Sequence, residues 1–360
     1  MASKRKFDLQ ETKGTYEIIG KTSRVESDKF FSERTNSKDG KKTEARKVNF
    51  GIIYDDNEAG TNKKEIFVGL DGYKRDKVYA SKSVTENGKK KFETKDFSWE
   101  NRYNLPEGFS PIGIRLGIEK QMNSEGKIEN VKKNLYEYDA CDELHNKLMD
   151  DQSVYVRGSI QNYTSSKGEH RQQFNISQIS LLSDDIEFGE GFTPKNHFKQ
   201  PICFKGIEQS PDRDGEWIIY GYVISYNSIE EIEMITRDAT IARNLHKQVK
   251  PYWYIELWGD IENIPNTESV KDGDVWGKEC SMDKQVAPSK TVLVVTGAKP
   301  SSIDGELYSE ESIDQALAII KQSKIADKDY GKSISDDEAG FKGNWGSVDP
   351  NSLDEEEDWE

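Results

Sequence analysis

The chain has 360 residues, of which 34% are hydrophobic, 10% aromatic and 32% charged, and its formal net charge is −15 at pH 7. This aromatic content indicates a folded protein with polar loops and excludes a wholly disordered chain. No apolar run approaches the roughly 18 residues of a membrane helix, and the basic, polar first residues do not form the apolar core of a secretory signal, so we expect neither.

The cysteines give no sign of a disulfide framework or a zinc site. Cys141, Cys203 and Cys280 lie far apart, and none has a histidine at ligand spacing. This pattern fits a reducing compartment, so we expect a cytoplasmic protein, in the host cytoplasm if the gene is viral. We expect no metal and no cofactor, and the length suggests two domains, with three as the alternative.

Charge is distributed unevenly along the chain. Residues 334–360 contain ten acids and one lysine, a net charge of −9. Residues 1–50 carry thirteen Lys and Arg against eight Asp and Glu, a net of +5, and residues 74–102 carry nine against five, a net of +4. The N-terminal territory is therefore basic, and the end of the chain has the opposite sign.

The first half of the chain alternates between strand patterns and one helix. Residues 1–13 are polar and basic and are expected to form a flexible arm. Apolar side chains then alternate with the period of half-buried strands over residues 15–21, 46–54, 65–70 and 112–118. Leu144 and Leu148, at i and i+4, predict a helix within residues 138–151. A strand at 153–163 and another at 171–179 predict a hairpin.

Residues 72–104 interrupt this order. They are dense in lysines and aromatics, including Tyr73, Tyr79 and Trp99, and show weak apolar periodicity. We interpret them as a long loop or β-ribbon inserted into the domain.

The second half begins with an irregular, acidic stretch at residues 183–200, which we expect to be a linker. Residues 201–325 form a second β-rich domain, with strand patterns and an amphipathic helix that follows Ser309. Residues 326–360 are expected to be a disordered acidic tail.

The hairpin carries a resemblance to a known family. Its first strand reads Val154-Tyr155-Val156-Arg157-Gly158-Ser159-Ile160, and after a turn with Lys167-Gly168 the second contains Phe174-Asn175-Ile176. This resembles the last two strands of OB-fold single-stranded-DNA-binding proteins, in which three strands, a helix and two further strands form a barrel. The acidic tail with its late aromatic is similar to the C-terminal tails of bacterial and phage members.

The resemblance covers residues 14–182 and the tail. The length of the chain is closer to that of a phage or plasmid replication protein than to that of the small cellular form. It implies a mainly β fold with few helices: an OB-fold barrel with the 72–104 insertion, followed by a second β-rich domain for which an OB-like fold is one option. It implies sequence-nonspecific binding of single-stranded DNA during replication and recombination, without enzymatic activity. The tail would recruit replication or recombination proteins or compete with DNA, although here Glu360 follows the terminal aromatic. No membrane partner is implied, and a homo-oligomer is left open.

Single-stranded DNA needs cations for its phosphates and aromatic faces for its bases. On this basis the expected DNA-binding residues are Lys47, Phe67, Tyr73, Lys74, Arg75, Lys89, Lys90, Lys91, Phe92, Phe97, Trp99, Arg102, Tyr155, Arg157, Tyr163, Lys167 and Arg171. The expected partner-binding residues are Asp354, Glu355, Glu356, Glu357, Asp358 and Trp359.

Other interpretations stay open at this point. In one of these interpretations, the aromatic side chains of residues 72–104 pack into the domain. Tyr155 and Tyr163 then pack against side chains of neighbouring strands. The tail is then a solubilising segment. For the whole chain, the alternatives are a structural or assembly protein that uses OB-like domains for protein contacts, and a metal-dependent DNA-processing enzyme.

Overall fold

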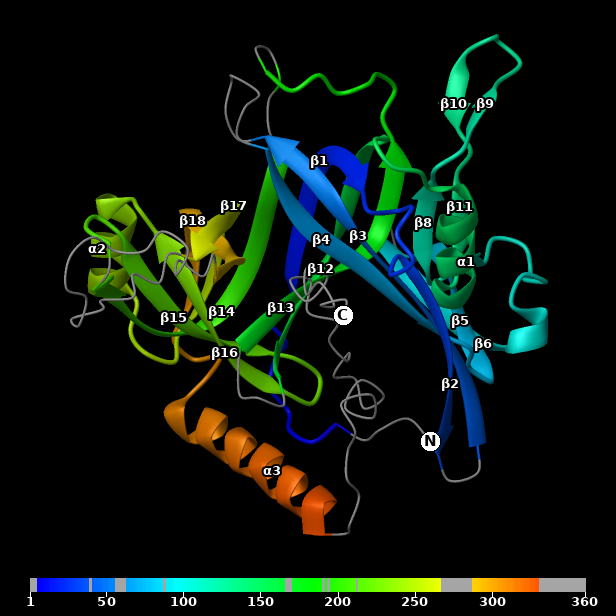
Figure 1. Ribbon diagram of the computed structural model, residues 1–360. Helices are drawn as coiled ribbons and strands as arrows, with labels where there is room; N and C mark the ends of the chain where they lie inside the picture. The colour runs from blue at the N-terminus through cyan, green and yellow to red at the C-terminus, as the bar shows by residue number, and fades with distance from the viewer. Residues whose placement is uncertain are drawn as a thin grey trace, which may run out of the picture. The chain divides into compact units, whose positions relative to one another are not determined.

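The structure is a computed structural model that describes residues 5–38, 41–55, 63–86, 89–165, 170–189, 192, 195–211, 213–266 and 287–329. The chain divides into two compact units, one of residues 13–199 and one of residues 1–12 with 200–360. Both are built mainly of strands, which confirms the predicted fold class (Figure 1).

The first unit contains a closed five-stranded barrel. Its strands are β1 (Gly14–Ser23), β3 (Lys41–Asp55), β4 (Lys63–Tyr73), β12 (Ser153–Thr164) and β13 (His170–Leu181). Antiparallel pairs join β1 to β3, β3 to β4, β12 to β13 and β1 to β12, and a parallel pair joins β4 to β13. This closed order, with a helix between the third and fourth strands, is the order of an OB-fold.

Alternation along the strands fills the barrel. Side chains at every second position point inward, and Ile18, Phe50, Ile52 and Ile66 are fully buried. Tyr16 packs edge-on against Phe174 across the interior, with 5.2 Å between ring centroids.

Helix α1 (Glu137–Lys147) packs against β3, β4 and β8 of this unit. Smaller elements extend the unit: β2 (Phe31–Lys38), which pairs with the first half of β3, β8 (Ile114–Gly117), β9 (Lys120–Met122), β10 (Ile128–Asn130) and β11 (Lys133–Leu135).

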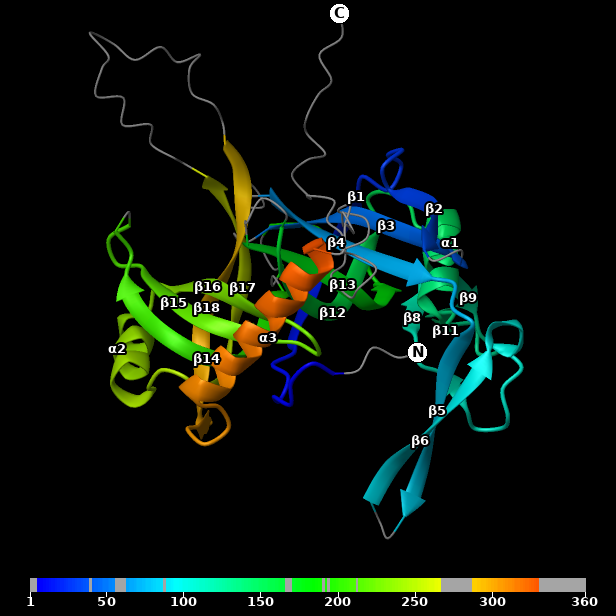
Figure 2. The same ribbon diagram turned by 90° about the horizontal axis from the view of Figure 1, so that it is seen from below.

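The expected insertion is a β-ribbon. Its strands β5 (Lys77–Glu86) and β6 (Lys89–Ser98) pair along their length, and β7 (Ser110–Pro111) and the 3-10 turn η1 (Trp99–Asn101) lie at its base. Figure 2 shows the ribbon projecting from the barrel of its unit.

The second unit repeats the barrel order. Its elements are β14 (Lys195–Gln209), β15 (Trp217–Ile224), β16 (Ile229–Thr236), α2 (Ala239–Gln248), β17 (Tyr254–Asn266) and β18 (Ala287–Asp304), followed by α3 (Glu310–Asp329). β14, β15 and β16 pair in sequence, β16 pairs with β18 in parallel, β18 pairs with β17, and β17 returns to β14. The second domain is therefore also OB-like.

Two expected boundaries need correction. Residues 5–12 are not a loose arm, because Phe7 and Leu9 pack on the second unit's cluster around α3, and the Thr12 amide donates a 2.8 Å hydrogen bond to the Ile224 carbonyl. The expected linker ends in a strand, since Phe198 is buried where β14 pairs with β1. β14 begins inside the expected linker and continues through Pro201.

Within the described residues, no helix is both long and apolar enough to cross a membrane.

Gly72 sets how closely α1 approaches β4. A Cβ at this position would lie 2.4 Å from the backbone N and Cα of Tyr138. We expect Gly72→Ala to lower the free energy of unfolding by about 1–3 kcal/mol, because the helix backbone must shift. Gly206→Ala is the matched control, since its Cβ meets nothing within 4 Å. Equal effects of the two substitutions in denaturant unfolding would contradict this close approach.

Candidate nucleic-acid interface

An apolar cluster fixes the base of the β5–β6 ribbon. Val78, Trp99, Tyr136 and Tyr138 are buried together, with Phe97 packed against them. Trp99 meets Tyr138 of α1 edge-on, with 5.6 Å between ring centroids. The ribbon is therefore joined to the helix under the barrel by a small core of its own.

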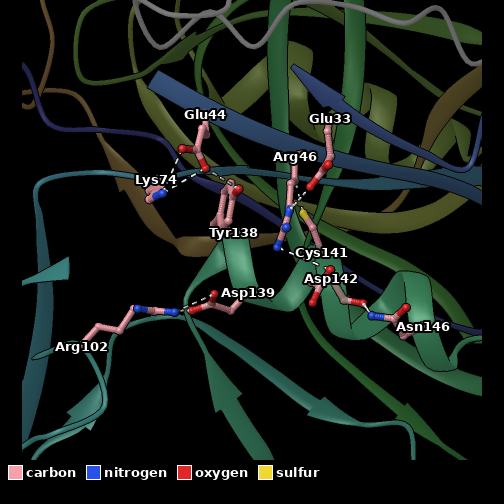
Figure 3. Close-up of polar contacts among 10 residues, drawn as sticks. All are labelled: Glu33, Glu44, Arg46, Lys74, Arg102, Tyr138, Asp139, Cys141, Asp142 and Asn146. Carbon is pink, nitrogen blue, oxygen red and sulfur yellow. Dashed lines mark hydrogen bonds and ion pairs between the residues drawn. The ribbon is translucent and has the colours of Figure 1, made fainter. Parts of the chain in front are cut away.

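A partly buried ion pair supports this core (Figure 3). The Nε of Arg102 donates to the Asp139 carboxylate over 2.7 Å, and the Tyr103 hydroxyl donates to the same group, also over 2.7 Å. The Arg102 guanidinium lies 4.3 Å from the Trp99 ring centroid. The hydrogen bond with Asp139 raises the pKa of Arg102, so its charge is held in place.

A second set of contacts joins α1 and the β4–β5 connection to β3. Glu44 accepts hydrogen bonds from the Lys74 amine (2.9 Å) and the Tyr138 hydroxyl (3.0 Å), and the Lys74 contact is the main reason that the Glu44 pKa falls. Arg46 lies over the Tyr138 ring at 4.2 Å and pairs with Asp142 of α1 at 3.5 Å. Figure 3 shows these side chains converging on the first turns of α1.

The two faces of the ribbon differ. Val78 and Ala80 are buried on one face. On the other face, Tyr79 is 51% exposed and Phe92 is 72% exposed. Phe92 is registered with Ser83, four residues along β5 from Tyr79, so the two rings are anchored about 13 Å apart on one side. Exposed aromatics held in such a row are suited to stacking on bases.

Lysines lie on both faces of the ribbon. Lys77, on the face of the two rings, pairs with Asp96 at 2.6 Å. Lys95, on the opposite face, pairs with Glu93 at 2.7 Å. Because both pairs are solvent-exposed, they contribute little to stability, and a phosphate can replace the carboxylate at small cost.

The outer face of the barrel strands is more internally paired. Lys47 on β3 lies 3.9 Å from Asp71 on β4, and Gln173 on β13 donates to Asp71 over 3.2 Å. Burial raises the pKa of Asp71, although Lys47 and Gln173 act in the opposite direction. On this face, Lys47 therefore already has an acidic partner within the protein.

Aromatic residues lie at other points of this outer face. The ring of Phe67 is half-buried, with the Arg24 guanidinium 5.1 Å from its centroid, and the Tyr73 hydroxyl accepts from Arg34 over 3.1 Å. On β12, the Tyr155 hydroxyl donates to Glu17 over 2.9 Å.

Some predicted residues do not offer a DNA contact. Trp99 and Tyr163 are buried, so neither presents an open ring face, and their prediction as stacking residues is wrong. Trp99 belongs to the ribbon's core. Phe97 is packed against the ribbon's core and half-buried.

Other predicted cations act within the protein. Lys47, Lys74 and Arg102 contact Asp71, Glu44 and Asp139, respectively. Arg75, Lys91 and Arg157 are exposed, and Arg171 is half-buried. Lys167, the side chains of Lys89 and Lys90, and the tail residues 354–359 lie outside the described residues.

The structure adds Tyr79 to the candidates. The sequence placed it in the basic, aromatic segment but gave no reason to prefer it over Trp99. The sequence alone does not give the register of β5 with β6, and this register places Tyr79 and Phe92 on one face of the ribbon. Among the described residues, no three His, Cys, Asp or Glu side chains are grouped to hold a metal ion.

Asp139→Ala tests the anchor. It leaves Arg102 and Tyr103 without their acceptor, so we expect the free energy of unfolding to fall by about 1–3 kcal/mol. Amides at the base of β5 and β6 should exchange with deuterium faster. Asp96→Ala removes an exposed pair from the same ribbon and should change neither readout measurably. Unaltered exchange in Asp139→Ala would refute the anchoring role.

Comparison with solved structures gives loose similarity. The wild-type single-stranded DNA binding protein from Thermus aquaticus matches with a TM-score of 0.36 and 9% identity, over 81% of this chain and 93% of that chain. A deletion mutant of the same protein matches with a TM-score of 0.34 and 10% identity, over 80% and 94% of the two chains. Scores at this level do not establish a common fold, so the barrel assignment depends on the strand pairings.

Among curated proteins, no sequence matches the chain. The family model described as YorF matches residues 13–331, which span most of both units, and the chain therefore belongs to the YorF family.

Proposed function

We propose that this protein binds single-stranded DNA without sequence preference and that the exposed face of the β5–β6 ribbon is its principal stacking surface. The observation that carries the proposal is the position of Tyr79 and Phe92. Both rings are largely exposed, share one face of a lysine-rich ribbon, and project from an OB-fold barrel.

The mechanism combines stacking with counterion release. Each base stacked on an aromatic ring contributes about 1–3 kcal/mol, and every base has a face that can stack, so sequence matters little. Lys77 shares the face of the two rings, and Lys91 and Lys95 extend from the opposite face of the same ribbon. These lysines neutralise phosphates, which makes binding weaken as salt rises. The anchor at α1 holds the ribbon before DNA arrives, which limits the entropy lost on binding.

The biological role that fits this chemistry is protection and organisation of single strands during replication and recombination, without catalysis. The acidic end of the chain recruits partner proteins of these processes or competes with DNA for the basic ribbon.

A role in protein assembly has one observation in its favour. Met122 and Ile128 are 66% and 67% exposed and are registered opposite one another on the β9–β10 hairpin. This apolar pair suits a protein contact better than a phosphate backbone.

The double substitution Tyr79→Ala, Phe92→Ala tests the stacking surface. We expect it to reduce affinity for a fluorescently labelled oligo-dT by about tenfold or more, because two stacking contacts are lost. The measurement is fluorescence anisotropy at two salt concentrations, and the wild-type affinity should fall as salt rises.

The matched control is Met122→Ala, Ile128→Ala, which removes two exposed apolar side chains from the other hairpin of the same unit. It should leave the affinity unchanged. Equal losses from both double substitutions, or wild-type binding that ignores salt, would rule out this mechanism.

Deletion of residues 347–360 tests competition by the tail. The segment carries many acids, so its removal should tighten oligo-dT binding several-fold at low salt and have little effect at high salt. The readout is the ratio of dissociation constants at the two salt concentrations. Unchanged or weaker binding at low salt would leave partner recruitment as the tail's only proposed role.

A further inference from the structure

The second unit contains a cavity of about 450 Å³ beside helix α2. Its lining comes from the end of β14, the first residue of β15 and one face of α2, all in the second unit. Volumes of this size are typical of small-molecule sites.

The sequence explains why the space is open. Ala239 and Ala242 end at Cβ, so the face of α2 that turns toward β14 and β15 is cut back. Ile207 and Trp217 form the apolar part of the lining. Ile207 is registered with Ile219 and Gln209 with Trp217, which places both pairs at one end of the barrel.

The polar lining is divided by charge. Arg243 and His246, at i and i+3, lie on the same face of α2, and within the described part of the chain neither has an ion-pair partner. Glu208 of β14 also lines the cavity, and its carboxylate accepts a 2.6 Å hydrogen bond from Tyr220. An anionic group entering the cavity is therefore directed toward α2 and away from Glu208.

We propose that this cavity binds a nucleotide, with its base against Trp217 and its phosphate against Arg243 and His246. Tryptophan offers the largest stacking surface for a base, and arginine matches phosphate with two parallel hydrogen bonds. One candidate source of this ligand is a nucleotide within a DNA strand, and for that source the proposal rests on the proposed function. The other source is a free mononucleotide.

Isothermal titration of the full chain with thymidine 5′-monophosphate tests the site. We expect saturable binding that Arg243→Gln weakens about fivefold or more, because the main phosphate partner is lost. Thymidine, which lacks the phosphate, should bind wild type at least that much more weakly. Lys247→Gln, an exposed change on the same helix outside the cavity, is the control and should have no effect.

Trp217→Ala tests the stacking wall, and Arg243→Gln keeps the test decisive if the tryptophan variant fails to fold. The Tyr79→Ala, Phe92→Ala protein should retain mononucleotide binding, since its changes lie in the other unit. No saturable binding, or binding that Arg243→Gln and Trp217→Ala leave unaltered, would overturn the proposal. The proposal would also be overturned if a synthetic peptide of residues 347–360 bound in the cavity and thymidine 5′-monophosphate did not. The site would then belong to an acidic aromatic peptide.

Oligo-dT binding by the same variants separates the two sources. Weaker oligo-dT binding by Arg243→Gln supports a nucleotide within a strand, whereas unchanged oligo-dT binding beside weakened mononucleotide binding supports a free nucleotide. If wild type binds the mononucleotide but not oligo-dT, the proposed function fails while the cavity's chemistry stands. If it binds oligo-dT but not the mononucleotide, the reverse holds.

Discussion

Closure of the first barrel depends on a short parallel contact between strands that lie far apart in sequence. Val68 pairs with Phe174 and Gly69 with Asn175, which joins β4 to β13 and turns a row of strands into a ring. Burial of Ile18, Phe50 and Ile66 inside that ring provides the driving force. This closure sets the position of α1 against the barrel, and α1 in turn positions the ribbon.

The position of α1 against β4 determines how the ribbon is supported. Gly72 allows the helix backbone to approach β4 closely, and this brings Tyr138 and Asp139 to the ribbon's base. Tyr138 contacts Trp99, Arg46 and Glu44, so one side chain joins the apolar core of the ribbon to the polar contacts of β3. A ribbon held in this way presents its exposed rings to DNA, and binding does not carry the entropy cost of ordering its base.

Two barrels of the same strand order carry different surfaces. The outer side of β15 and β16 in the second unit presents Tyr220, registered with Glu233, and Tyr222, registered with Glu231. The hydrogen bond to Glu208 raises the pKa of Tyr220 to about 12. Negative charge along these strands opposes a phosphate backbone, so the shared topology does not imply a shared ligand. The cationic side chains of the proposed nucleotide cavity lie instead on α2.

Strand periodicity was enough to predict much of the fold. Alternation placed the inward residues Val48, Phe50 and Ile52, and the order of strands and helix indicated the first barrel. The packing of residues 5–12 was hidden, because it depends on contacts such as Thr12 with Ile224, more than 200 residues away. For the site, composition located the ribbon, but only register shows that Trp99 is core and that Tyr79 shares a face with Phe92.

Hydrogen–deuterium exchange of the full chain, with and without oligo-dT at low salt, shows whether DNA binds to the ribbon. Binding to the ribbon should slow exchange across β5 and β6, with smaller changes on the outer strands of the first barrel. Protection confined to other segments, with exchange of residues 77–98 unaltered at saturating DNA, would contradict binding at the ribbon.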